Sequence, residues 1–187
     1  MKILIIRFSS LGDIVLTSPV PRLIKKRFPS SEVHFLTKKN YSETYINNIN
    51  ISKVYLLDEN FFELYKKLKK NNYDLIIDLH NNIRSFFLRK LLGVKSLIYN
   101  KNRLKRWLIV NLKLKVKIPH IVDSYIKTLS SMNIKNDNKG LDYFLVKNDF
   151  KCLNLLPKLH RKSFISLVIG AKHKTKILPT KKLIELC

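Results

Sequence analysis

The chain is poor in cysteine and has no long hydrophobic run. Its 187 residues include two cysteines, Cys152 and Cys187. Two cysteines so far apart cannot form a disulfide framework or a metal cluster, so we interpret both as reduced thiols. No apolar stretch reaches the roughly 18 residues of a spanning helix, and the first residues lack the order of a signal peptide. We therefore expect a cytoplasmic protein.

Glycine is also scarce, with four residues in the chain. One of them, Gly12, lies in the turn 9–13 that follows the first apolar run. A dinucleotide-binding fingerprint has three glycines at such a turn, and a phosphate loop ends in Gly-Lys-Ser/Thr, but neither pattern is present. The sequence therefore disfavours NAD binding and NTP hydrolysis. Histidines such as His34 and His160 show no metal-ligand spacing, so we expect neither a cofactor nor a metal.

Acidic residues are few: 13 stand against 37 basic ones, which gives a net charge of +24. Such an excess indicates a polyanionic or phosphorylated partner, unless a coding bias toward Lys, Asn and Ile produces it. The distribution favours a partner, because residues 79–122 contain no acidic residue at all. This acid-free segment carries eleven basic residues: Arg84, Arg89, Lys90, Lys95, Lys101, Arg103, Lys105, Arg106, Lys113, Lys115 and Lys117.

What the chain does contain is an alternation of strand-like and helix-like segments. The apolar runs 2–8, 32–37, 53–57, 73–79 and 96–99 predict five strands. Between and after them, periodic apolar residues predict helices over 13–28, 41–48, 61–70, 83–92, 103–112 and 121–132. Strands that alternate with helices form a parallel sheet with helices on both faces, so we expect an α/β, Rossmann-like domain.

The expected domain organisation follows from changes in composition. Residues 1–132 form the Rossmann-like domain, and residues 133–163 form a linker region that opens with Asn, Lys, Asp and Gly. Residues 164–187 repeat the opening pattern, with an apolar run at 164–169 and a helix beginning near Thr180. One strand and two helical turns cannot bury their own apolar faces. We therefore expect 164–187 to be the first βα unit of a truncated second domain.

The turn after the first strand is the best candidate for a functional site, because ligands of open α/β sheets bind outside the carboxyl ends of the strands. This rule predicts that Ser9, Ser10, Gly12 and Asp13 face a site. Asp13 has two interpretations. A carboxylate in the first turn of a helix commonly caps the helix, and the local chemistry alone favours that role. A carboxylate at this edge is also placed to act as a general base toward an alcohol.

Four segments, in this order, resemble glycosyltransferase family 9, the lipopolysaccharide heptosyltransferases. They are Ile3 to Pro19, with its Ser-Ser-Leu-Gly-Asp turn, Tyr73 to Ser85, His120 to Tyr125, and Gly170 to Pro179. The chain departs from the family pattern at Leu178, where the family has tryptophan, and at Asn82, where glycine is usual.

The resemblance implies an inverting, metal-independent enzyme of the two-domain GT-B fold that transfers heptose from ADP-heptose to the inner core of lipopolysaccharide. The N-terminal domain would hold the acceptor, Kdo-lipid A or inner-core lipopolysaccharide, and the C-terminal domain the ADP-sugar. The resemblance implies Asp13 as catalytic base, with Ser10 and Gly12 shaping its turn, and Lys176 toward the donor phosphates. The basic stretch around Arg84, Arg103 and Arg106 matches the family in character and would bind acceptor phosphates and carboxylates. His80 follows the fourth strand and is a further candidate for acceptor binding, although a histidine in a turn is more often solvated. Because most of the donor domain is missing, we expect these 187 residues to be an inactive fragment.

A second hypothesis is a non-catalytic basic module that binds nucleic acid or anionic lipid. The chain has no RNP motif, recognition-helix pattern or Cys/His finger, and its aromatic residues are not interleaved with the basic ones. We therefore expect no nucleic-acid partner. Peripheral contact with the inner membrane stays open, because Trp107 beside Arg106 is suited to a membrane interface, although packing within the fold is the commoner role of such a residue.

Overall fold

The computed structural model describes residues 1–57, 60–114, 118–145, 150, 155–161, 163–171 and 176–186, and for residues 103–106 it describes the backbone alone. The chain forms two compact units, Met1–Leu145 and Val146–Cys187. Within the described residues, no helix is long and apolar enough to cross a membrane.

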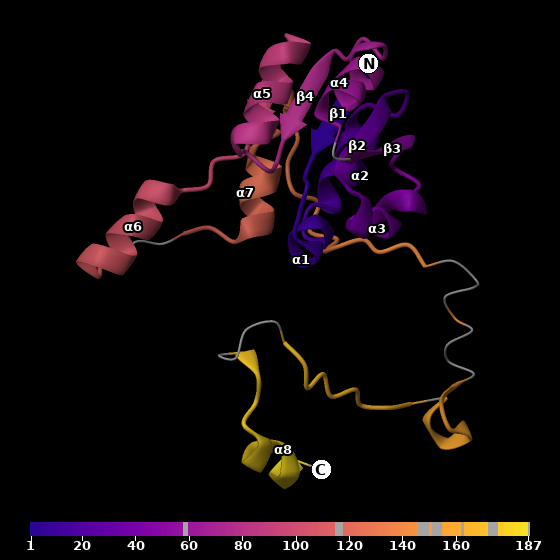
Figure 1. Cartoon of the computed structure of the whole chain (residues 1–187), viewed down its shortest axis with the longest axis vertical. Coiled ribbons are helices and arrows are strands. Elements are labelled where there is room, and N and C mark those ends of the chain that lie inside the picture. The colour runs from indigo at the N-terminus through magenta and orange to yellow at the C-terminus, as the bar shows by residue number, and fades with distance from the viewer. Residues whose placement is uncertain are drawn as a thin grey trace. The chain divides into compact units, whose positions relative to one another are not determined.

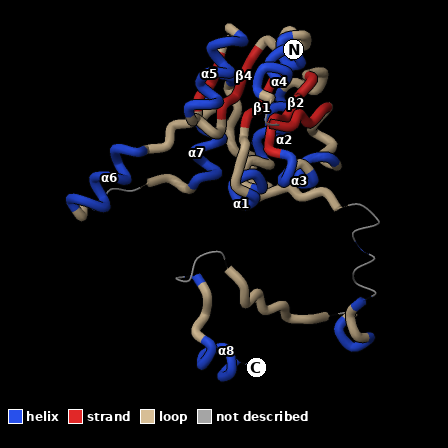
Figure 2. The backbone as a smooth tube through the Cα atoms, viewed as in Figure 1, coloured by secondary structure: helices blue, strands red, loops and turns tan. Residues whose placement is uncertain are grey.

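The first unit alternates strands with helices (Figures 1 and 2). Its strands are β1 (Lys2–Ile6), β2 (Glu32–Lys38), β3 (Lys53–Leu57), β4 (Leu75–Asp78) and β5 (Ser96–Ile98). Its helices are α1 (Leu11–Val15), α2 (Pro19–Arg27), α3 (Glu43–Ile46), α4 (Phe61–Lys69), α5 (Ile83–Leu92), α6 (Arg103–Leu112) and α7 (Ile121–Lys127), with short 3-10 turns at Lys39–Tyr41 and Ser130–Met132.

The five strands form one parallel sheet in the order β3-β2-β1-β4-β5. The predicted α/β class with a parallel sheet is therefore confirmed. The first strand lies at the centre, where Ile5 is in register with Phe35 of β2 and with Ile77 of β4. This order places the connections that follow β1 and β4 side by side at the carboxyl edge of the sheet.

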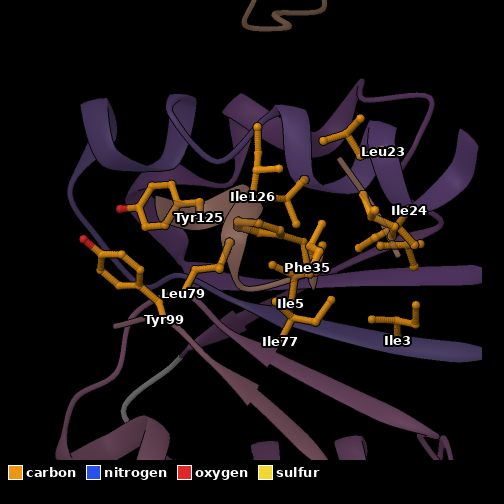
Figure 3. Close-up of a cluster of buried hydrophobic side chains, with 14 of the residues drawn as sticks. Ile3, Ile5, Leu23, Ile24, Phe35, Ile77, Leu79, Tyr99, Tyr125 and Ile126 are labelled. Atoms are coloured by element: carbon orange, nitrogen blue, oxygen red, sulfur yellow. The ribbon is translucent and has the colours of Figure 1, made fainter. Parts of the chain in front are cut away.

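Successive side chains of the strands point to opposite faces of the sheet, and each face packs on its own set of helices. Ile3 and Ile5 face a core to which α1, α2, α3 and α7 contribute, whereas Leu4 and Ile6 face a core that includes α4 and α5. Figure 3 shows members of the first core from the strands and the helices: Ile3, Ile5, Phe35, Ile77, Leu23, Ile24, Tyr125 and Ile126. Helices therefore cover both faces of the sheet, as predicted.

The segment 13–28, predicted as one helix, is two helices, α1 and α2. Pro19 is the reason, because proline has no N–H to continue the hydrogen-bond ladder and is tolerated only in the first turn of a helix. Pro19 accordingly occupies the first position of α2. The break limits α1 to Leu11–Val15.

The first unit continues past residue 132, because a partly buried arginine of α2 binds the following segment. Arg22 pairs with the carboxylate of Asp137 through Nη2 at 2.9 Å, pairs with Asp142, and donates to the carbonyl oxygen of Gly140 at 2.9 Å. The backbone N–H of Asp142 donates in turn to Ser18 Oγ at 2.9 Å. Residues 137–142, which the sequence assigned to the linker region, therefore pack on the first unit.

The second unit holds helix α8 (Thr180–Leu186), which matches the helix predicted near Thr180, and a 3-10 turn at Lys158–His160. The predicted strand at 164–169 does not form: these residues lie outside any strand, and Ile165 is fully exposed. A strand needs a hydrogen-bonded neighbour, and the described residues of this unit supply none.

Candidate functional site

The candidate site lies at the carboxyl edge of the sheet, in the connections that follow β1 and β4. The chain leaves β1 at Ile6, turns through residues 7–10 and enters α1, whose third residue is Asp13. The side chain of Asp13 is about one-third exposed, at 31%. Its carboxylate is therefore reachable from solvent, as a base at this edge must be.

The two oxygens of the Asp13 carboxylate have different surroundings. Oδ2 accepts from the backbone N–H of Ser10 at 3.2 Å and from Ser10 Oγ at 2.9 Å, and it pairs with Arg7 Nη2 at 2.7 Å. Among the described residues, Oδ1 has no hydrogen bond or ion pair. Asp13 thus caps α1 through one oxygen and keeps the other for a ligand, so the capping role and the general-base role do not compete.

Arg7 is the buried ion-pair partner of the Asp13 carboxylate. Its side chain is 9% exposed, Nη1 donates to the carbonyl oxygen of Leu79 at 2.7 Å, and the guanidinium lies 5.7 Å from the centre of the Tyr125 ring. Burial raises the pKa of Asp13, but the Arg7 charge and the Ser10 hydrogen bonds outweigh it and hold the pKa below its ordinary value. Asp13 is therefore ionised at neutral pH.

Replacing Arg7 by methionine should raise the pKa of Asp13, because burial of the carboxylate then acts without an opposing charge. In the unmodified protein, the ion pair stabilises the fold fully above the ordinary aspartate pKa and loses this effect as the pH falls through the lowered pKa. In Arg7→Met this acid-dependent part of the stability should shrink. Carboxyl-carbon NMR titration of Asp13 measures the expected rise of its pKa.

The matched control for that titration is Arg27→Met, which removes the same charge from an exposed position on α2. Equal titration curves for Asp13 in the two variants would show that Arg7 does not set the pKa of this carboxylate.

A second carboxylate organises the connection after β4. Asp78 is fully buried, and its Oδ1 accepts from the backbone N–H groups of His80 at 3.0 Å and Asn81 at 2.7 Å. Its Oδ2 pairs with Arg89 Nε of α5 at 2.9 Å. Asn81 lies in the left-handed region at φ 46° and donates through Nδ2 to the carbonyl oxygen of Tyr99. These bonds fix the place where His80 leaves the sheet.

His80 is half-buried, whereas a histidine in a turn is more often freely solvated. Its ring lies 4.8 Å from the ring of Phe8. Burial, with the nearby positive charges of Arg7 and Lys101, lowers the pKa of His80 to about 4. The ring is therefore neutral at pH 7, and it offers a hydrogen bond rather than a charge to a ligand.

A pocket of about 420 Å³ opens beside this histidine. It is lined by residues at or just after the carboxyl ends of β1, β2, β3 and β4 and by the first residues of α5: Phe8, Ser9, Lys38, Leu57, His80, Asn82, Ile83 and Arg84. Lys38 and Arg84 are exposed and bring two positive charges to it. The pocket is suited to an anionic group at the edge where Asp13 lies.

The structure thus brings several of the predicted site residues to one edge. Ser10 and Gly12 shape the Asp13 turn, and His80 and Arg84 line the adjacent pocket. A Cβ added at Gly12 would meet no atom within 4 Å, so packing does not require a glycine at this exposed position.

For the other three predicted residues, Arg103, Arg106 and Lys176, the assignment to the site stays a prediction. The backbone of Arg103 and Arg106 belongs to α6, and their side chains lie outside what the structure describes. Lys176 is exposed and belongs to the second unit. In the described part of the chain, no group of three or more His, Cys, Asp or Glu residues is placed to hold a metal ion.

Two residues of the site escaped the sequence analysis. Lys38 ends β2, and the rule that ligands bind at the carboxyl ends of parallel strands would have identified it. Arg7 carried no usable signal, because a charged residue after an apolar run is normally exposed, and only the Asp13 carboxylate and the Leu79 carbonyl make its burial favourable.

Comparison with known sequences gives one consistent family. The profile of glycosyltransferase family 9 (heptosyltransferase) matches residues 61–186. Lipopolysaccharide heptosyltransferase 1 of Campylobacter coli is 30% identical over 205 aligned positions, which cover the whole chain and 60% of that relative. Lipopolysaccharide heptosyltransferase 3 of Escherichia coli is 30% identical over 94 positions, which cover 45% of the chain and 28% of the relative. The chain thus spans less than two thirds of each relative.

Solved structures show the same fold at lower identity. A family 9 glycosyltransferase from Veillonella parvula superposes with a TM-score of 0.76 at 18% identity, over 99% of this chain and 58% of that protein. The heptosyltransferase WaaC of Escherichia coli, solved with ADP-2-deoxy-2-fluoro heptose, gives 0.65 at 18% identity, over 100% and 65%. The chain therefore shares the fold of these solved glycosyltransferase structures over the parts that superpose.

Proposed function

Because the chain belongs to glycosyltransferase family 9, we propose that its first unit is the acceptor-binding half of a heptosyltransferase. In this proposal, heptose passes from ADP-heptose to the inner core of lipopolysaccharide. The relatives' names support the donor and acceptor classes. The observation that carries the proposal is the Asp13 carboxylate, ionised and held by Arg7 and Ser10, with Oδ1 open at the carboxyl edge of the sheet.

Asp13 acts in this proposal as the general base. Its Oδ1 takes the proton of an acceptor hydroxyl while the hydroxyl oxygen attacks the anomeric carbon of the heptose. The bond between that carbon and the phosphate oxygen breaks, and its electron pair leaves with ADP. Attack on the face opposite the leaving group inverts the configuration at the anomeric carbon.

The negative charge that develops on the leaving ADP needs a positive partner. The family resemblance assigns this role to Lys176 and implies that no metal ion takes part. We propose accordingly that residues 164–187 belong to the donor-binding part of the enzyme, and residues 1–132 to the acceptor-binding domain.

The acceptor lies, in this proposal, in the pocket beside His80. Lys38 and Arg84 pair with its phosphates or Kdo carboxylates, and the neutral His80 ring offers a hydrogen bond to a sugar hydroxyl.

Such a reaction takes place in the cytoplasm at the inner membrane, where a nucleotide sugar meets a lipid-linked acceptor. Contact with the anionic membrane surface is part of the proposal. The comparisons give no support to the alternative, a non-catalytic basic module that binds nucleic acid or anionic lipid.

The acceptor pocket is tested by reversing one of its charges. Arg84→Glu should weaken binding of a water-soluble, Kdo-containing core oligosaccharide by about tenfold or more, as measured by calorimetry on the 187-residue chain. Binding by the unmodified chain should also weaken with added salt, because exposed charges are screened over about 8 Å at physiological ionic strength.

The matched control is Lys139→Glu, which makes the same change of charge at an exposed position on the loop beside α2. Equal losses in the two variants would show that net charge, and not the pocket, governs binding. Affinity that does not change with salt would also contradict the assignment.

A further inference from the structure

Helix α5 carries large apolar side chains toward solvent as well as toward the core, which is unusual for a helix on the outside of a sheet. Its inner face is explained by the core, because Leu88 is fully buried against α4 and the sheet. Its outer face has no such explanation. Ile83, Phe87 and Leu91 follow one another at intervals of four residues, so they lie in one row along the helix.

This row is open to solvent. The exposed fractions are 76% for Ile83, 54% for Phe87 and 51% for Leu91, and Phe86 beside them is 44% exposed. We call these four residues the α5 stripe. The rings of Phe86 and Phe87 pack edge to face, with their centres 5.7 Å apart. A contiguous patch of large apolar side chains on a protein surface usually marks an interaction site.

The charge around the α5 stripe is positive. Arg84 and Lys90 are exposed on the same helix, and Lys95 is exposed just beyond it. Lys90 Nζ lies 5.9 Å from the centre of the Phe86 ring. All of these residues belong to the acid-free segment 79–122. The surface therefore carries aromatic and aliphatic groups together with cations, and the segment 79–122 that forms it contains no carboxylate.

We propose that the α5 stripe is the surface on which this protein docks to an anionic lipid bilayer. Aromatic and aliphatic side chains flanked by Lys and Arg bind the boundary between headgroups and acyl chains, where the apolar groups leave water and the cations meet lipid phosphates. A second copy of the chain fits this surface less well, because it would bring a second cationic face. Residues 146–187 are also cationic, with ten basic and two acidic residues.

The position of the stripe supports this occupant. Its first residue, Ile83, and its neighbour Arg84 also line the pocket assigned to the acceptor. This part of the inference rests on the proposed function: docking through α5 places the pocket at the membrane surface, where a lipid-linked sugar is anchored. The lipid contact itself is independent of catalysis.

The test is co-sedimentation of the 187-residue chain with vesicles of equal parts phosphatidylethanolamine and phosphatidylglycerol. Phe87→Ser should weaken binding roughly tenfold, since a partly buried phenylalanine contributes about that much on transfer from water. Ile49→Ser is the control, because Ile49 is 81% exposed in the loop after α3. Thermal unfolding confirms that both variants are folded. Equal binding by the two variants would overturn the proposal.

Charge is tested separately, with residues that do not line the pocket. Lys90→Glu should weaken binding to these vesicles by about tenfold, and Lys139→Glu should not. Equal binding of the unmodified chain to phosphatidylcholine vesicles would overturn the anionic specificity. Sedimentation of the lipid-free chain as a dimer that Phe87→Ser dissociates would assign the stripe to a second copy instead. The vesicles hold no donor or acceptor, so Asp13→Asn should bind them normally, and failure of the catalytic proposal would leave this result unchanged.

Discussion

Replacing Asp13 by asparagine is expected to lower the rate of heptose transfer by about 100-fold or more, which is the usual contribution of a general base. The amide keeps the shape of the side chain but cannot take the proton of the acceptor hydroxyl. Because the chain spans 60% of the Campylobacter coli relative, the assay uses a fusion that adds the uncovered part of that relative. Release of ADP from ADP-heptose is the measured quantity.

The same fusion carrying Glu43→Gln provides the control, since Glu43 is an exposed carboxylate in the first turn of α3. Affinity for the core oligosaccharide should change little in either variant, because Glu43 does not line the acceptor pocket and an amide at position 13 still offers a hydrogen bond to the acceptor hydroxyl. Turnover by Asp13→Asn within a fewfold of the unmodified fusion would remove Asp13 from the mechanism and leave it as a helix cap.

The second large effect concerns stability. Replacing Asp78 by alanine should lower the free energy of unfolding by about 3–5 kcal/mol, because the change leaves a poorly solvated Arg89 without its partner. It also deprives the N–H groups of His80 and Asn81 of their acceptor. Urea unfolding measures the loss, and an unchanged m-value would show that the unfolded state is not affected.

Two variants separate the charge from the position of this residue. Asp74→Ala, just before the same strand, removes an exposed carboxylate that accepts from the N–H of Lys2, and it should cost less than about 1 kcal/mol. Asp78→Ala combined with Arg89→Leu should recover part of the stability, because no unpaired charge is left. A double variant as unstable as the sum of the single ones would show that Asp78 and Arg89 act independently.

The sheet was predictable because buried parallel strands are short, nearly continuous apolar runs. The run 53–57 matches β3 residue for residue. Gly93 ends α5 in the left-handed conformation at φ 67°, which glycine adopts without strain. Asp13 was predictable for the same reason: its position after the first strand fixes the edge of the sheet at which it lies.

What sequence reasoning missed depends on contacts between distant parts of the chain. Arg22 pairs with Asp137 and Asp142, which lie more than a hundred positions away in the sequence. No local sequence pattern predicts this pairing. The two oxygens of the Asp13 carboxylate likewise differ because Arg7 pairs with one of them, and only the folded structure shows that Arg7 is buried. The exposed row on α5 was hidden because an apolar helix pattern does not say which face meets the core.

The place of β1 at the centre of the sheet also has a consequence for synthesis on the ribosome. β1 is made first, yet one of its two neighbours, β4, begins only at Leu75. At typical translation rates of about 5–20 residues per second, β4 follows roughly 4–14 s later. Until then one edge of an apolar strand has no native partner, and other nascent chains compete for it. The yield of folded protein therefore depends on what shields the first strand during that interval.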